Sequence, residues 1–355
     1  MKLPILNIYA NSPKVKQISD SLAVRENKVH LKGLIGSSLS VIVASLFKKE
    51  ELPYLLILQD KEEAAYYLND LEQLIGEEDV LFYPGSYRRP YQIEDTDNAS
   101  VLLRAEVLNR INSRKKPALI VSYPEALFEK VVTRKELDKN TLKVAVGDQV
   151  SIDFINEVLF EYEFKRVDFI TEPGEFSVRG GILDVFSFSN ENPFRIEFFG
   201  NEVDSIRTFD VETQLSIEKQ KKITIIPNVE NKFFQENRES FLNYINEKTV
   251  LLIQNTDLLF SKLDQLFGRA KEIFGTMDAT VNHIAPEELF LNQEAFIKKA
   301  LEFTIAELGS KAIFRTQKTF EFHILPQPSF NKQFDLLLNN LNDNQQNGNK
   351  NYIFC

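Results

Sequence analysis

The chain has 355 residues, of which 43% are apolar and 26% charged, a composition typical of two or three folded domains and not of a disordered protein. Its formal net charge of −10 argues against binding nucleic acid through the overall field of the molecule, although it leaves local basic patches open. The single cysteine, Cys355, excludes an internal disulfide and a multi-cysteine metal site. No apolar run reaches the ~20 residues that span a bilayer, and Met1 to Ser12 lacks a signal-peptide pattern. We therefore expect a cytoplasmic protein with no metal site and no membrane partner.

Residues 1–138 alternate apolar strands with amphipathic helices, which predicts an α/β domain built on a parallel sheet. We expect strands at Lys28–Leu31, Tyr54–Leu58, Asp79–Tyr83 and Ala118–Val121, and helices at Ser38–Lys49, Glu62–Ile75 and Asp97–Asn112. Asp60 is expected to cap the second of these helices.

The first strand leads into a loop that resembles a phosphate-binding loop, which reads G-x-x-x-x-G-K-[ST] when it is intact. With Gly33 on the first glycine, Ser38 replaces the second glycine, Leu39 replaces the lysine, and Ser40 keeps the hydroxyl; Gly36 is an additional glycine. Without the lysine ammonium, a triphosphate loses charge-assisted contacts worth several kcal/mol. We predict an inactive loop, with no catalytic residue and no ATP or Mg²⁺ in this chain. Weak nucleotide binding at the helix N-terminus stays an alternative to a plain turn.

Residues 139–212 follow a different pattern, which predicts a separate small α+β domain. A helix capped by Ser151 and ending near Tyr162 precedes a run of strands, whose succession indicates antiparallel pairing. The strands are expected at Leu142–Val146, Arg166–Phe169, Glu175–Val178, Gly181–Phe188, Phe194–Phe199 and Glu202–Phe209. Gly200-Asn201 is a two-residue hairpin loop of the favoured type.

Residues 213–355 return to the α/β pattern and are expected to form a second α/β lobe. Strands are predicted at Ile223–Pro227 and Val250–Ile253, and helices at Gln235–Asn246 and Asp257–Phe274. The polar stretch 341–351 predicts a mobile loop. "YIFC" at the end reads as the start of a buried strand, so we expect a piece of a longer chain.

Two stretches then indicate a family: "FYPGSYRRPYQIEDTDNASVLLRAEVLNRI" and "EPGEFSVRGGILDVFSFSNENPFRIEFFGNEVDSIRTFDVETQLS". They resemble the N-terminal UvrB-like module of bacterial transcription-repair coupling factor (Mfd). The resemblance implies a degenerate P-loop NTPase fold of the UvrB/RecA type, with parallel-sheet lobes and an inserted small α+β domain. The tyrosine-rich hairpin of UvrB has no room in "RRPYQIEDTDNAS".

In this family the small domain is the docking site for UvrA, and arginines on its strands carry the contact. The matching positions are Arg166 and Arg179, whereas Ser177 replaces a further arginine of UvrB. Arg195 and Glu197 are weaker candidates because they could pair across the hairpin. An arginine on an outward strand face is otherwise only a solvated charge.

The resemblance implies a recruitment module that docks UvrA and does no chemistry itself. The full-length protein is expected to be an ATP-dependent DNA translocase that binds RNA polymerase and double-stranded DNA through other domains. The alternative is a UvrB-like nucleotide-dependent module, either an ATPase or a binder of damaged DNA.

Overall fold

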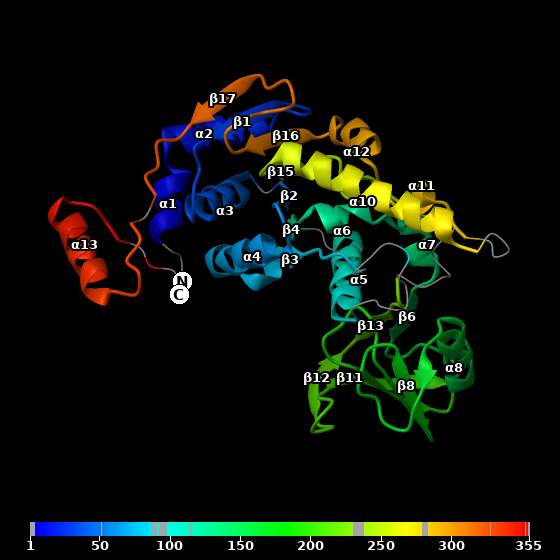
Figure 1. Cartoon of the computed structure of the whole chain (residues 1–355). Helices are drawn as coiled ribbons and strands as arrows, with labels where there is room; N and C mark the ends of the chain where they lie inside the picture. Colours follow the sequence, from blue (N-terminus) through cyan, green and yellow to red (C-terminus); the bar gives the residue numbers. More distant parts are fainter. Residues whose placement is uncertain are drawn as a thin grey trace.

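The computed structural model describes residues 4–50, 52–86, 91, 98–113, 116–229, 238–278, 283–326, 328–351 and 353. Two sheets organise it (Figure 1). The larger sheet is entirely parallel, with seven strands in the order β17-β1-β16-β15-β2-β4-β3. Its strands are β1 (Lys28–Lys32), β2 (Tyr54–Ile57), β3 (Val80–Phe82), β4 (Leu119–Ser122), β15 (Val250–Ile253), β16 (Thr304–Leu308) and β17 (Lys318–Glu321). The predicted α/β class is confirmed.

Helices cover the seven-stranded sheet in two groups. Helix α3 packs with α1, α2 and α4, whereas α10 packs with α6, α11 and α12. The first group comprises α1 (Pro4–Ala10), α2 (Pro13–Leu22), α3 (Ser38–Glu50) and α4 (Lys61–Ile75); the others are α5 (Asn98–Ser113), α6 (Pro124–Phe128), α7 (Arg134–Lys139), α10 (Thr256–Thr276), α11 (Pro286–Leu289) and α12 (Gln293–Ala300). Asp60 caps α4 as predicted, because its carboxylate accepts the Glu63 N–H at 2.9 Å. None of the helices in the described ranges has the length and apolar content needed to cross a membrane.

The two α/β segments share one sheet, which differs from the expected pair of lobes. Strand β15 lies between β2 and β16, and β16 in turn pairs with β1. All four residues of β2 and of β15 are buried, so each strand needs a neighbour on both edges and a cover on both faces. Joining the segments into one sheet supplies both.

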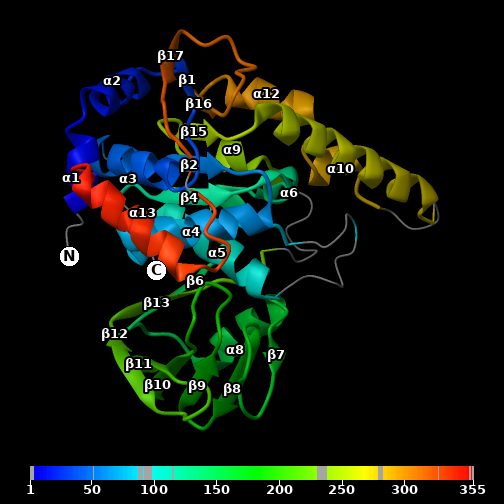
Figure 2. The same ribbon diagram turned by 60° about the vertical axis from the view of Figure 1, so that its left-hand side comes forward.

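The second sheet has six strands in the order β12-β11-β10-β9-β8-β7 and lies beside the α/β body in both views (Figures 1 and 2). Its strands are β7 (Lys165–Arg166), β8 (Glu175–Arg179), β9 (Ile182–Val185), β10 (Phe194–Phe199), β11 (Glu202–Phe209) and β12 (Ser216–Gln220). The β10–β11 hairpin turns at Gly200, whose φ of 63° is the positive value that the sequence predicted. The sheet therefore continues past residue 212, to Gln220.

One face of this small sheet packs against α8 (Ile152–Glu161). Ile155 and Leu159 of the helix are buried, and the ring of Phe160 meets that of Phe176 edge-on at 5.2 Å. The cap predicted at Ser151 is confirmed by its bond from the Phe154 N–H. A short pair, β6 (Leu142–Ala145) with β13 (Lys222–Ile225), carries the chain into and out of the small sheet. The opposite face, called the polar face below, carries charged side chains of β8 to β12 beside a small apolar cluster of Ile170, Phe186 and Phe209.

The C-terminal part departs most from the sequence prediction. Of the helix expected at 235–246, residues 235–237 lie outside the described residues. From residue 238 the chain instead forms β14 (Arg238–Glu239), which pairs with β5 (Val131–Val132), and a short α9 (Phe241–Tyr244) capped by Ser240. The stretch expected as a loop from 341 is helical as far as Gln346, because α13 (Phe334–Gln346) has apolar residues at helical spacing from Phe334 onward. No residue of α13 is buried, and the helix stands away from the sheets (Figure 1). Ile353 is exposed and outside any strand, and the rest of "YIFC" lies outside the described residues, as does most of "RRPYQIEDTDNAS".

A buried ion pair fixes the chain where β3 leaves the large sheet. The Arg104 guanidinium of α5 lies 3.2 Å from the Glu129 carboxylate, and both side chains are almost fully buried. Glu129 also accepts the backbone N–H and the hydroxyl of Ser86, and Arg104 donates to the Pro84 carbonyl at 2.8 Å. The pair therefore ties the loop after β3 to α5 and to the segment before β5.

Replacing Glu129 by alanine should lower the free energy of unfolding by about 3–5 kcal/mol, because it removes the carboxylate from a buried, hydrogen-bonded ion pair. Urea denaturation measures the loss. The matched control is Glu302→Ala, which breaks an exposed pair with Lys299 and should cost less than about 1 kcal/mol. Equal losses in the two variants would contradict the role of the buried pair.

Candidate functional site

The loop after β1 joins a strand to a helix, as a phosphate loop does, but offers no lysine ammonium. Leu39, which stands at the lysine position, is 4% exposed and packs in the hydrophobic core. The Ser40 hydroxyl points inward as well and donates to the buried Asp70 carboxylate at 2.8 Å. Gly33 has φ +88°, and a Cβ at this position would lie 2.2 Å from the Phe322 carbonyl oxygen, so the segment after β17 fills the space beside the loop.

Three backbone N–H groups of this loop are used within the loop itself. The Ser38 hydroxyl accepts the Ile35 N–H at 2.9 Å and donates to the Ile35 carbonyl. The N–H groups of Ser38 and Leu39 donate to the carbonyls of Ile35 and Gly36. In a phosphate loop such groups point at the anion. Here they close two successive tight turns at the start of α3.

The polar face of the small sheet carries a row of charged side chains. Strand pairing places Ser177, Asp184, Arg195, Arg207 and Lys219 side by side across β8 to β12. Neighbours in such a row share one face of the sheet. The row therefore holds one carboxylate among three cations.

Asp184 is the centre of this row. It is 1% exposed, and its two oxygens accept Nε and Nη2 of Arg195 at 2.7 and 2.9 Å, a two-pronged contact. Nη2 of Arg179 donates to the same carboxylate at 2.5 Å. A buried carboxylate must be paired, and here two guanidiniums do it.

Arg195 is enclosed in the fold. Besides Asp184 it contacts the side chain of Gln214, and its guanidinium lies 4.2 Å from the centre of the Phe209 ring. The hydrogen bond to Asp184 raises the pKa of Arg195 above its ordinary value. With 14% of its side chain exposed, Arg195 offers little to a partner.

Glu197 pairs across the β10–β11 hairpin with Arg207 and accepts the Ser205 hydroxyl at 2.6 Å. These contacts, the Ser205 hydrogen bond first, hold the pKa of Glu197 below its ordinary value. Pairing across the hairpin, which the sequence left open for both residues, thus occurs for Glu197, whereas Arg195 pairs with Asp184 on the other neighbouring strand, β9. Both residues help to order the face.

Arg179 and Arg166 remain accessible. The Arg179 side chain is 42% exposed and lies over the ring of Phe169 at 5.2 Å. Arg166 is exposed, and the structure gives its side chain no partner among the described residues. The β7–β8 register aligns Arg166 with Phe176, which faces α8, so Arg166 leaves the sheet on the helix side. The two arginines lie near the same edge but on opposite faces.

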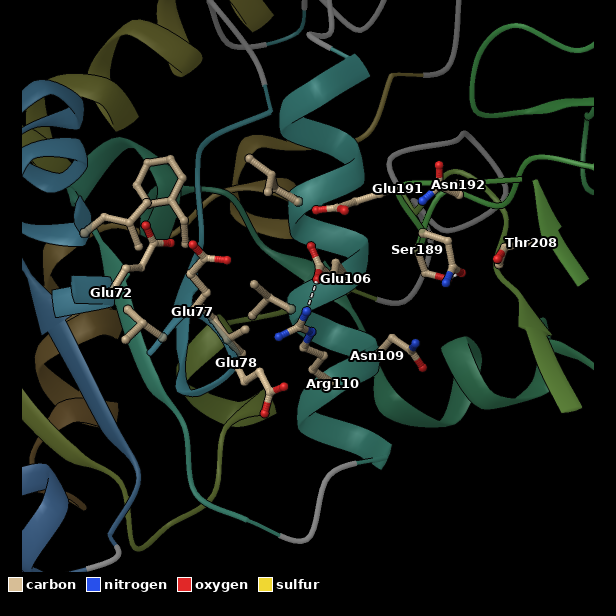
Figure 3. A pocket seen from close by; sticks show the side chains of 17 residues that line it. Glu72, Glu77, Glu78, Glu106, Asn109, Arg110, Ser189, Glu191, Asn192 and Thr208 are labelled. Atoms are coloured by element: carbon tan, nitrogen blue, oxygen red, sulfur yellow. Dashed lines mark hydrogen bonds and ion pairs between the residues drawn. The ribbon is translucent and has the colours of Figure 1, made fainter. Parts of the chain in front are cut away.

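A cavity of about 660 Å³ separates the α/β body from the β9–β10 loop (Figure 3). Its lining includes five glutamates and one arginine: Glu72, Glu77, Glu78, Glu106, Glu191 and Arg110. Burial raises the pKa of Glu72 and of Glu106, and the ion pair with Arg110 opposes the shift at Glu106. This concentration of carboxylates is unsuited to a nucleotide phosphate.

Two residues of the polar face were missed by the sequence reading. Asp184 stands in the quoted stretch "GILDVF", and an acid inside an apolar strand signals a buried charge that needs partners. Phe169 gives no such signal, because an exposed phenylalanine cannot be told from a core one by residue type. Phe186 and Phe188 are buried. His30 is held by the Gly309 carbonyl at 3.0 Å.

Residues 142–231 match the family model of the UvrB interaction domain. The chain is 35% identical over 224 residues to the transcription-repair-coupling factor of Bacillus subtilis (strain 168), covering 63% of this chain and 19% of that protein. It is 30% identical to the Myxococcus xanthus factor and 27% identical to that of Escherichia coli (strain K12), over 59% and 60% of this chain and 18% of each relative. The chain thus spans about a fifth of the length of these curated relatives. The predicted resemblance to this family is confirmed.

Restoring the missing lysine should not restore nucleotide binding. Leu39→Lys places an ammonium in the core and should cost about 2–4 kcal/mol of unfolding free energy, whereas Leu39→Met should cost less than ~1.5 kcal/mol. Denaturation curves measure the cost, and calorimetry with ATP and Mg²⁺ should show no binding to either variant. Saturable ATP binding by Leu39→Lys would contradict the description of the loop as two closed turns.

Proposed function

We propose that this chain, which is similar to transcription-repair-coupling factors, is a recruitment module that docks UvrA through its small sheet. By bringing UvrA, it would direct nucleotide excision repair to RNA polymerase stalled at DNA lesions. The match of residues 142–231 to the UvrB interaction domain supports the choice of surface. The observation that carries the proposal is Arg179, an arginine held in place on one side and exposed on the other.

The physical basis of the docking is the preordering of Arg179. A flat guanidinium on a strand, already bonded to Asp184 and lying over a ring, loses little side-chain entropy when it binds. Arg166 contributes from the helix side of the same edge. Arg195 and Glu197 act indirectly, because their charges are satisfied inside the sheet.

We assign no catalysis to this chain. The buried Leu39 offers no cation to a triphosphate, the Ser40 hydroxyl is bonded to Asp70, and the N–H groups of Ile35, Ser38 and Leu39 are used within the loop after β1. The full-length protein would supply an ATP-dependent DNA translocase, with ATP and Mg²⁺ in its motor domains, and would contact RNA polymerase and double-stranded DNA elsewhere. The alternative, a nucleotide-dependent UvrB-like module, needs chemistry that this loop does not offer.

The direct test is the affinity of the isolated chain for UvrA from its source organism, measured by calorimetry. Arg179→Gln and Arg166→Glu should each weaken binding about tenfold or more, because the first removes a preordered interface arginine and the second reverses the charge at the other proposed contact. Their melting temperatures should match that of the wild type, because Asp184 stays paired with Arg195 in both variants.

The matched control is Arg315→Glu, a charge reversal at an exposed arginine between β16 and β17. It should leave the affinity within about twofold of wild type, since rim charges contribute little. If Arg315→Glu weakens binding as much as the other two, the contact is a general charge effect and the docking surface is misplaced. Absence of binding by the wild type would overturn the proposed function itself.

A further inference from the structure

Phe169 is an apolar side chain in an unusual setting. It lies in the segment between β7 and β8, 64% exposed, on the face of the small sheet opposite to α8. Exposed single apolar residues are common and need no explanation alone. This one lies under the guanidinium of Arg179, 5.2 Å from ring centre to the central carbon.

The surroundings of Phe169 are well ordered. Its neighbour Ile170 is 2% exposed and packs with Phe186 and Phe209 in a small cluster of its own. The Asp168 carbonyl accepts the Ser177 hydroxyl at 3.0 Å, and the N–H groups of Thr171 and Glu172 donate to the buried Glu175 carboxylate. The loop is therefore held on both sides of Phe169, and the exposed ring has a defined position.

The donor inventory of Arg179 shows what it can still bind. A guanidinium has five N–H donors, and among the described residues Arg179 uses one Nη2 donor, on Asp184. Two guanidiniums and one carboxylate leave the Arg179–Asp184–Arg195 group with a net charge of +1. Since Arg195 is enclosed, that charge is presented at Arg179.

We infer that Phe169 and Arg179 together form the specific anchor of the docking surface, and that they take a partner segment presenting a carboxylate next to an apolar side chain. The carboxylate accepts the free N–H groups of Arg179, and the apolar side chain covers the Phe169 ring. Burying the ring removes water from the ion pair, which strengthens it. This inference rests on the proposed function, with an acidic segment of UvrA as the occupant.

The anchor differs from a simple basic patch in what it requires. A patch needs only positive charge, so lysine can replace arginine in it. The anchor needs the planar fork of arginine, both to pair with a carboxylate through two N–H groups and to stack on a ring. It also needs an aromatic or large apolar ring at position 169.

Calorimetry of the whole chain with UvrA tests the anchor through three variants. Phe169→Ala and Arg179→Lys should each weaken binding about tenfold or more. The matched control is Phe199→Ala, which removes an 84% exposed phenylalanine from the β10–β11 hairpin of the same sheet. It should leave the affinity within about twofold of wild type. All three positions are exposed, so the variants should fold with melting temperatures like that of the wild type.

The outcomes separate the anchor from the proposed function. If the wild type binds UvrA and Phe169→Ala binds equally well, the anchor is wrong while the docking function stands. If Arg179→Lys retains full affinity, the site recognises charge alone, and the inferred pairing of the planar guanidinium with a carboxylate is wrong. If the wild type does not bind UvrA, the proposed function fails first. Loss with Phe169→Ala and Arg179→Lys, but not with Phe199→Ala, supports the anchor.

Discussion

The arrangement of the polar face depends on one buried carboxylate. Asp184 sits on β9 almost without exposure, and an unpaired charge there would be prohibitively costly. Two arginines from neighbouring strands supply the counter-charge, but in unequal ways. Arg195 gives Asp184 a two-pronged contact and is enclosed by Gln214 and Phe209, whereas Arg179 gives one donor and keeps the rest outside. Because of this difference, the ion pair with Asp184 holds the Arg179 guanidinium in place and leaves it accessible to a partner.

In the proposed function, the other half of the molecule supports that surface and does no chemistry. The loop between β1 and α3 leads into a helix that buries Leu39 and directs the Ser40 hydroxyl to Asp70. Strand β1 still has a structural role, because it belongs to the fully parallel sheet that both α/β segments share.

Local signals in the sequence predicted local structure well. The caps at Asp60 and Ser151 and the hairpin turn at Gly200 each depend on a few neighbouring residues, and each is confirmed. Strand β16 was missed because Glu307 interrupts its apolar run; the structure buries that carboxylate against the Thr256 hydroxyl and two backbone N–H groups. The shared sheet, the Asp184 contacts and the Phe169–Arg179 pair join residues through tertiary packing, which periodicity and motif spacing do not encode.

Amide hydrogen exchange of the chain with and without UvrA tests the central claim most directly, because it locates the partner without any substitution. If UvrA docks on the small sheet, amide exchange in the complex should be slower at residues 167–182, around the Phe169 ring and the Arg179 guanidinium. Exchange in the turn at residues 33–38 should be unchanged. Slower exchange confined to residues 33–38, with the small sheet unaffected, would contradict this docking.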